Sequence, residues 1–218
     1  MTRSVTAEVW FDFICPWCLI GKRQLETALA AFAQEAPEAQ VSVAWRPFVL
    51  RPQTPPEGEP YLQFYLSRLG GGARVAARQA QVREAGRAAG VEFAFERIET
   101  LPNTFDAHSL VDYARRAGGD AAAEALIERL FTAFFVEGSN IGDEDFLTWA
   151  ARSAGVDPRG WVEERDAHLS LARITGWARA AERARVSSVP FYLFNGRSAL
   201  AGAESPAALF AALRSAAT

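Results

Sequence analysis

Residues 6–22, TAEVWFDFICPWCLIGK, decide the fold. The first nine of them are rich in valine, tryptophan and phenylalanine, which favour a buried β-strand. Pro16 follows at once, and a proline is tolerated in the first turn of a helix because its missing N–H would have no partner there. Apolar residues then recur at helical spacing to about Glu35. The stretch therefore predicts a strand that leads directly into a helix.

Two further stretches are predicted to complete the same sheet. Apolar residues alternate from Val41 to Trp45 and predict a second strand that ends at Pro47, giving a strand–helix–strand unit. Near the C-terminus, residues 191–194 read as a strand, Asn195-Gly196 as a two-residue hairpin turn, and residues 197–201 as the returning strand. Ser205 and Pro206 then open a last helix over residues 207–215.

Between these two parts the pattern is helical. Residues 51–60, RPQTPPEGEP, contain four prolines and are predicted to be a linker. Residues 61–185 predict five to seven helices, with helix starts at Asp143 and Asp157. We therefore predict an α/β protein with a thioredoxin fold of order βαβ…ββα. Residues 1–50 and 186–218 form the thioredoxin-like domain, and residues 61–185 form an inserted helical domain.

Composition argues against several classes of partner. The net charge is −3, with 23 Lys and Arg against 26 Asp and Glu, and the basic residues show no stripe along the sequence. This balance gives no sign of a nucleic-acid or anionic membrane partner. No apolar run approaches the roughly 18–20 residues that span a bilayer, and no leader pattern precedes the first strand, so we expect a cytoplasmic protein. The patterns leave open whether it is a monomer or a homodimer.

The two cysteines, Cys15 and Cys18, stand three residues apart where the strand becomes a helix. Residues at this spacing lie on one face of a helix, so the two sulfurs can form a disulfide and reopen it. The unpaired N–H groups and the positive end of the helix favour thiolate at Cys15, and the thiolate is the nucleophile of disulfide exchange. We therefore expect Cys15 to form mixed disulfides and Cys18, one turn deeper, to resolve them.

Other interpretations of the pair are weaker. Half of a zinc site has the same spacing, but His108 and His168 are separate and lack the spacing of zinc ligands, so we expect no metal. The pair could also be an inert structural disulfide, but such disulfides are rare in cytoplasmic proteins. Lys22, one turn after Cys18, is expected to be an ordinary solvated lysine. Trp17, between the cysteines, is expected to be exposed and to contact partners.

A second element of the site is expected at Val189-Pro190, just before the strand of residues 191–194. An X–Pro bond is usually trans. In a thioredoxin fold this position brings a cis-proline beside the cysteine pair, where the preceding backbone can pair with an extended substrate or with glutathione. We therefore expect Val189 and Pro190 to form the substrate-binding edge of the site.

The sequence resembles the DsbA-like oxidoreductases of the FrnE branch. Three separated groups of residues carry the resemblance: Cys15-Pro16-Trp17-Cys18 with its flanks Trp10–Ile14 and Ile20–Lys22; Pro102-Asn103-Thr104 with Ala107-His108; and Val189-Pro190-Phe191 with Asn195-Gly196 and Ala201–Ala203. The resemblance implies dithiol–disulfide exchange with protein thiols or glutathione and no bound cofactor. The same superfamily includes kappa-class glutathione transferases and 2-hydroxychromene-2-carboxylate isomerases, so a glutathione-dependent isomerase or transferase is an alternative. A chaperone-like binding module is a third.

Four positions are weaker candidates for supporting roles. The resemblance implies that the segment containing Asn103 and His108 faces the active site, although a lone histidine on a helix is more often a structural hydrogen-bonding residue. Asp12 precedes Cys15 by three residues, where its carboxylate would disfavour a thiolate or relay protons to Cys18. Pro16 adds no charge to the pair. The aromatic residues around the motif, Trp10, Phe11, Phe13, Trp45 and Phe48, are expected to be core.

Overall fold

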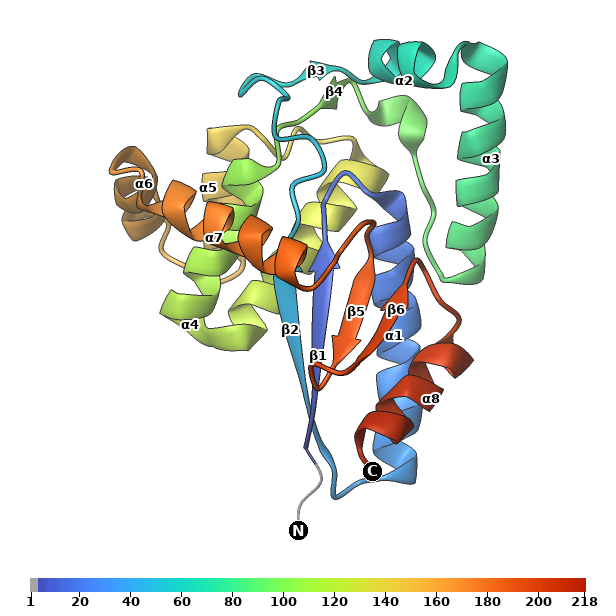
Figure 1. The fold of residues 1–218 in the computed structure, drawn as a ribbon. Coiled ribbons are helices and arrows are strands. Elements are labelled where there is room, and N and C mark those ends of the chain that lie inside the picture. Colours follow the sequence, from blue (N-terminus) through green and yellow to red (C-terminus); the bar gives the residue numbers. More distant parts are fainter. Residues whose placement is uncertain (1–3) are drawn as a thin grey trace.

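The computed structural model describes residues 4–218 and contains a central four-stranded sheet in the order β2-β1-β5-β6. β1 (Ser4–Phe11) pairs in parallel with β2 (Gln40–Pro47), and the helix α1 (Pro16–Glu35) connects them. β5 (Phe191–Phe194) runs antiparallel to β1 and pairs with β6 (Ser198–Ala201). The sheet therefore joins the two ends of the chain, as the thioredoxin fold requires (Figure 1).

Helices cover both faces of this sheet. α1 packs with the last helix, α8 (Pro206–Ala216), over the face that carries Val5, Ala7 and Val9. Successive strand residues point to opposite faces, so Arg46 of β2 lies on the other side, where its guanidinium sits 4.4 Å from the ring centroid of Trp177. Trp177 belongs to α7 (Leu169–Arg183), which packs against β2.

The middle of the chain is helical, as predicted. Its elements are β3 (Glu59–Pro60), α2 (Tyr61–Leu69), α3 (Gly72–Ala88), the 3-10 turn η1 (Phe95–Arg97), β4 (Thr100–Leu101), α4 (Phe105–Thr132), the π-helical turn η2 (Ala133–Glu137), α5 (Glu144–Ser153) and α6 (Arg159–Asp166), followed by α7. No sequence pattern predicted the short antiparallel pair β3–β4. One hydrophobic cluster runs from Trp10 and Phe11 of the sheet through Phe131 of α4, and the division into two domains stays a prediction.

Capping side chains begin two helices where the sequence placed them. Asp143 accepts a hydrogen bond from the Phe146 N–H at 2.8 Å, and Ser205 accepts one from the Ala208 N–H at 3.2 Å. The hairpin turn differs from the prediction, because it contains three residues, Asn195 to Arg197, between the paired ends of β5 and β6.

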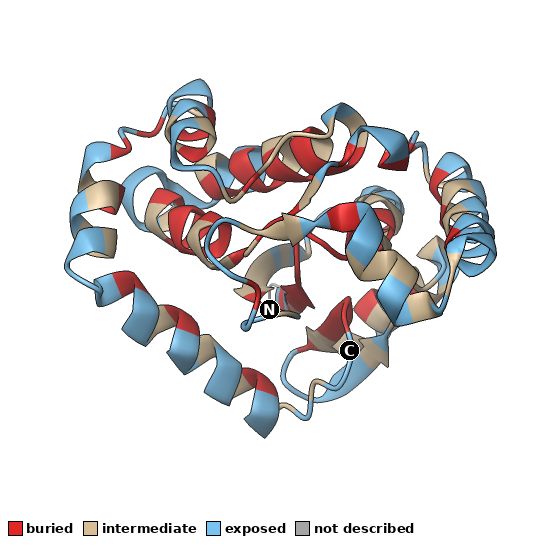
Figure 2. Ribbon diagram, turned by 90° about the horizontal axis from the view of Figure 1, so that it is seen from above, coloured by how far each residue is buried: buried red, intermediate tan, exposed pale blue. Residues whose placement is uncertain are grey.

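The segment predicted as a linker, residues 51–60, is held by side-chain contacts. Arg51 forms an ion pair with Glu59 at 2.7 Å and a hydrogen bond with the buried Thr54 at 3.2 Å. Four prolines suggested a loose connection, but these polar partners fix the segment against the start of α2. Figure 2 shows buried residues along the inner faces of the helices and on the strands, with exposed residues outside.

Candidate active site

Cys15 occupies the turn between β1 and α1. It is the N-cap residue of α1, with φ −95° and ψ 107°, and Pro16 follows at the first helical position. The Cys15 N–H donates to the Asp12 carbonyl at 3.1 Å, and the Cys18 N–H donates to the Cys15 carbonyl at 2.9 Å. These backbone bonds fix Cys15 at the positive end of a 20-residue helix.

The two cysteines are free thiols that come within 3.4 Å of each other. This separation is longer than the S–S bond of about 2.05 Å, so the two sulfurs are not bonded to each other. Cys15 is 7% exposed and lines a cavity of about 750 Å³, whereas Cys18 is only 1% exposed. Burial raises the pKa of the Cys18 thiol, and Cys15 adds to the increase through a hydrogen bond and its charge.

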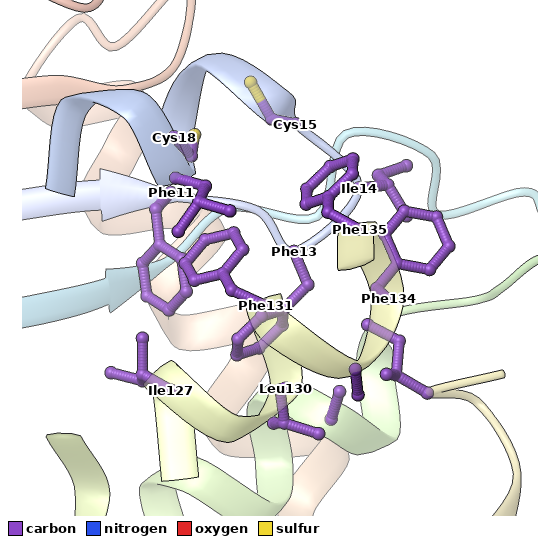
Figure 3. Packing of buried hydrophobic residues seen from close by; sticks show 14 of the residues in the cluster. Phe11, Phe13, Ile14, Cys15, Cys18, Ile127, Leu130, Phe131, Phe134 and Phe135 are labelled. Atoms are coloured by element: carbon purple, nitrogen blue, oxygen red, sulfur yellow. The ribbon is translucent and has the colours of Figure 1, made fainter. Parts of the chain in front are cut away.

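The aromatic cluster around Phe11, Phe13 and Phe131 lies beneath the cysteines (Figure 3). The Cys15 sulfur points away from this cluster (Figure 3). The two cysteines therefore have different environments, with one sulfur at a cavity wall and the other in the interior.

The predicted substrate-binding edge lies beside Cys15. The Val189–Pro190 peptide bond is cis. The Cys15 thiol donates to the Val189 carbonyl at 3.5 Å, and the Pro190 carbonyl accepts from the Gly202 N–H at 2.8 Å. Val189 lines the same cavity as Cys15. Gly21 of α1 allows this approach, because a Cβ there would lie 2.9 Å from Cγ of Pro190.

Asp12 and His108 contact each other, although 96 residues separate them in the sequence. Both side chains are fully buried, with His108 Nε2 at 3.3 Å from Asp12 Oδ1. The other carboxylate oxygen accepts from the Leu50 N–H at 2.7 Å. The imidazole lies near the rings of Phe11 and Phe13, with centroid separations of 5.1 and 4.8 Å, and Nδ1 has no partner within residues 4–218.

Side chains that the sequence did not single out form part of the cavity wall at Cys15. α2 and α3 contribute Tyr61, Tyr65, Arg68 and Arg78 to its wall. Burial raises the pKa of Tyr65 to about 12, and the charge of Cys15 is the second cause. No motif marks these residues; the only signal is the run of arginines between residues 68 and 87.

Comparison with known proteins places this geometry in a family. A family model described as the DsbA-like thioredoxin domain matches residues 6–214. The chain belongs to this family. Family membership supports thiol–disulfide oxidoreductase chemistry in general terms.

Individual relatives agree with the family. The Bacillus subtilis protein YwbO, described as uncharacterized, is 28% identical over 196 residues, which cover 87% of this chain and 86% of YwbO. A probable DsbA oxidoreductase from Streptomyces coelicolor is 26% identical, with a TM-score of 0.83 over 97% of this chain and 89% of that one. The cytosolic disulfide reductase DsbM from Pseudomonas aeruginosa, solved with GSH, is 18% identical with a TM-score of 0.67 over 96% and 98%. At that identity the DsbM likeness shows the fold alone.

Two expectations for side chains next to the cysteines were wrong. Lys22 is 3% exposed instead of solvated, and it forms ion pairs with Glu26 and Glu128. Glu128 is part of α4, so this DsbA-like chain ties its cysteine-bearing helix to the helical insertion through a buried cation. Burial would raise the pKa of Glu128, but hydrogen bonds from Arg23 and Lys22 lower it to about 2.

Trp17 is half-buried, although it was expected to be exposed. Its ring packs against the hydrophobic cluster, and the Arg78 guanidinium lies 5.4 Å from the ring centroid. One edge of Trp17 nevertheless lines the cavity, as Pro16 also does. Both residues are therefore part of the cavity wall beside Cys15.

Asn103 forms hydrogen bonds with the backbone of Thr54 and of Phe105. Its amide nitrogen donates to the Thr54 carbonyl at 2.6 Å, and its oxygen accepts from the Phe105 N–H at 2.9 Å. The described residues that line the cysteine cavity do not include Asn103. Its contacts join the 51–60 segment to the start of α4, and a role for Asn103 in the chemistry stays a prediction.

Residues 4–218 contain no group of three or more His, Cys, Asp or Glu side chains that could hold a metal ion. Over the same residues, no helix has the length and apolar character needed to cross a membrane.

Proposed function

We propose that this protein is a thiol–disulfide oxidoreductase in which Cys15 is the nucleophile and Cys18 the resolving cysteine. The observation that carries the proposal is the unequal placement of the two sulfurs. Cys15 lies at the N-terminus of α1 on the cavity wall, and Cys18 is buried behind it. A substrate in the cavity therefore meets Cys15 first, and Cys18 can react only with the sulfur of Cys15.

The reaction has two steps. The Cys15 thiolate attacks one sulfur of a substrate disulfide, a Cys15–substrate bond forms, and the second substrate sulfur leaves as a thiolate that takes up a proton. Cys18 then loses its proton and attacks Cys15 Sγ, which releases the first substrate sulfur and leaves a Cys15–Cys18 disulfide. Two electrons pass from the dithiol to the substrate, and the reverse sequence oxidises a substrate dithiol.

Cys18 needs a proton acceptor for the second step because burial raises its pKa. We propose that the buried Asp12–His108 pair, 3.3 Å apart, receives that proton directly or through a water molecule. The Asp12 charge is one of the smaller contributions to the raised pKa of Cys18, so a charge at Asp12 acts on the Cys18 sulfur. The pair is thus coupled electrostatically to the resolving cysteine.

We propose that the partners are protein thiols or glutathione, and that the protein works in the cytoplasm as a monomer or homodimer. DsbM, a neighbour in fold, was solved with GSH. Support within this chain comes from the cavity, whose volume of about 750 Å³ lies in the range typical of small-molecule sites, about 300–1,000 Å³.

Reduction of insulin disulfides tests the proposal. The wild-type protein, with dithiothreitol as reductant, should precipitate insulin chains faster than dithiothreitol alone. Cys15→Ser should abolish the acceleration, because no mixed disulfide can form. Cys18→Ser is the matched control that keeps the nucleophile, and it should accumulate a mixed disulfide with substrate that mass spectrometry detects.

The outcomes also separate the alternatives. Full insulin reduction by Cys15→Ser would refute the proposed chemistry. An isomerase or transferase that only binds glutathione would keep its activity in Cys18→Ser, and it would show saturable glutathione binding by calorimetry. A chaperone-like module would suppress aggregation of an unfolded protein even when both cysteines are replaced.

A further inference from the structure

The helices that close the cysteine cavity carry an unusual charge. Residues 61–88, which form α2, α3 and their connection, contain five arginines and one glutamate, in a chain whose net charge is −3. α2 and α3 stand beyond the end of β1 at which α1 begins (Figure 1). The helices on this side of the molecule therefore carry an excess of positive charge.

Two of these arginines, Arg68 and Arg78, line the cavity itself. Neither forms an ion pair with a carboxylate within residues 4–218, whereas Arg51, the third arginine of the wall, is paired with Glu59 at 2.7 Å. Each of the two guanidinium groups lies near an aromatic ring, and Arg78 also donates a hydrogen bond to Gln81 Oε1 at 2.7 Å. The Arg68 guanidinium lies 6.0 Å from the ring centroid of Phe64, and the Arg78 guanidinium 5.4 Å from that of Trp17.

The rest of the cavity wall does not balance this charge. None of the described residues that line it is acidic; the polar ones are tyrosine, glutamine and serine side chains. A cleft lined by one sign of charge attracts ligands of the opposite sign and raises their association rate by about 10–1,000-fold. A guanidinium can also bind a carboxylate through two parallel hydrogen bonds.

Access to the sulfur limits the size of the ligand. Cys15 is 7% exposed, at the wall of a cavity of about 750 Å³. A cavity of this volume lies in the range of small-molecule sites, so a small disulfide can enter it and reach the sulfur.

We infer that the substrate of Cys15 is a small disulfide, or the corresponding thiol, that carries carboxylate groups bound by Arg68 and Arg78. This inference rests on the proposed function, because it names the substrate class of the same site. The anionic disulfide accepts two electrons from the Cys15–Cys18 dithiol and is released as two thiols, with the same bond changes as described above.

The test is a single-turnover reaction of the pre-reduced protein, which needs no added reductant. Three disulfides of similar size are compared at low salt: dithiodipropionate with two carboxylates, hydroxyethyl disulfide without charge, and cystamine with two ammonium groups. Formation of the Cys15–Cys18 disulfide is followed by acid quench, alkylation and mass analysis. Each rate is divided by the rate of the same disulfide with dithiothreitol, which removes differences in intrinsic reactivity.

The corrected rate for dithiodipropionate should exceed that for hydroxyethyl disulfide by about tenfold, and cystamine should be slowest. Added salt at about 0.5 M should reduce the preference, because screening weakens attraction between exposed charges. The variant with Arg68→Gln and Arg78→Gln should bring the three rates within about twofold of one another. Arg87→Gln is the matched control, since Arg87 is an exposed arginine of α3 outside the cavity wall, and it should retain the preference.

Different failures have different meanings. If the reduced protein forms no Cys15–Cys18 disulfide with any of the three compounds, the proposed function fails. If it reacts with all three at equal corrected rates, the function stands and the inferred substrate class is wrong. The inference is also overturned if the preference survives in the double variant, or if an acidic peptide disulfide reacts faster than dithiodipropionate after the same correction.

Discussion

Gly21 lies where α1 passes closest to Pro190, so Gly21→Ala is a sharp test of packing behind the cysteines. An added Cβ would come to 2.9 Å from Cγ of Pro190 and would also clash with the buried Tyr192 hydroxyl. Real Cβ atoms almost never approach heavy atoms this closely, and neither a proline ring nor a fully buried tyrosine can move aside easily. Inserting a methyl group into such a site typically costs about 1–3 kcal/mol of stability.

A second effect opposes this cost. Replacing glycine by alanine inside a helix stabilises the helix by about 1 kcal/mol. Gly176 provides the matched control, because it lies within α7, is exposed, and has nothing within 4 Å of an added Cβ. Gly176→Ala measures the helix effect alone, and the difference between the two variants measures the clash.

Thermal unfolding followed by circular dichroism gives the comparison. For a chain of this size, 1 kcal/mol corresponds to about 2–4 °C in Tm, so Gly21→Ala should unfold about 2–12 °C below Gly176→Ala. Displacement of Pro190 should also move the Val189 carbonyl away from the Cys15 thiol, so insulin reduction should slow in Gly21→Ala and stay unchanged in Gly176→Ala. Equal increases in Tm for both variants would refute the packing described for Gly21.

Three further predictions concern side chains around the cysteines. Iodoacetamide at neutral pH should alkylate Cys15 well before Cys18, which is buried and has a raised pKa; equal labelling in peptide mass analysis would contradict the assigned roles, and both should react in urea. Glu128→Gln should weaken the dependence of Tm on acid pH. Folding lowers the pKa of Glu128 from 4.5 to about 2, so its stabilisation is present above pH 4.5 and is lost as the pH falls toward 2; a variant with the wild-type acid profile would contradict this. Asp12→Ala should lower stability in urea unfolding by about 1–3 kcal/mol because the buried His108 imidazole and the part-buried Leu50 N–H both lose their partner, and Asp12→Asn, which keeps one acceptor oxygen, should lose less; equal losses would argue against this role.

Local sequence patterns were sufficient for the elements that depend on neighbouring residues. Pro16 marks the start of α1 because a proline is tolerated at the first helical position, where its missing N–H would have no partner. Ser205 and Asp143 cap helices through bonds to residues three positions away. The mixed sheet could be predicted as well, since strand periodicity is confined to the two ends of the chain.

The candidate site was only partly visible in the sequence. The cysteine pair and the position of Val189-Pro190 were found, because each belongs to a short motif at a strand boundary. Lys22 was misjudged because its burial depends on Glu128, which is 106 residues away in α4. No pattern near Lys22 in the sequence indicates that its side chain contacts α4.

By itself, the sequence determined that this protein has a strand-to-helix junction with two cysteines at its first turn, and a sheet built from both ends of the chain. The tertiary structure alone decided that His108 lies against Asp12 and that Arg68 and Arg78 line the cavity over Cys15. The physical reason is the range of the interactions. Capping and periodicity act over three or four residues, whereas the charge around Cys15 depends on how α2 and α3 pack over a sheet whose strands are far from them in the sequence.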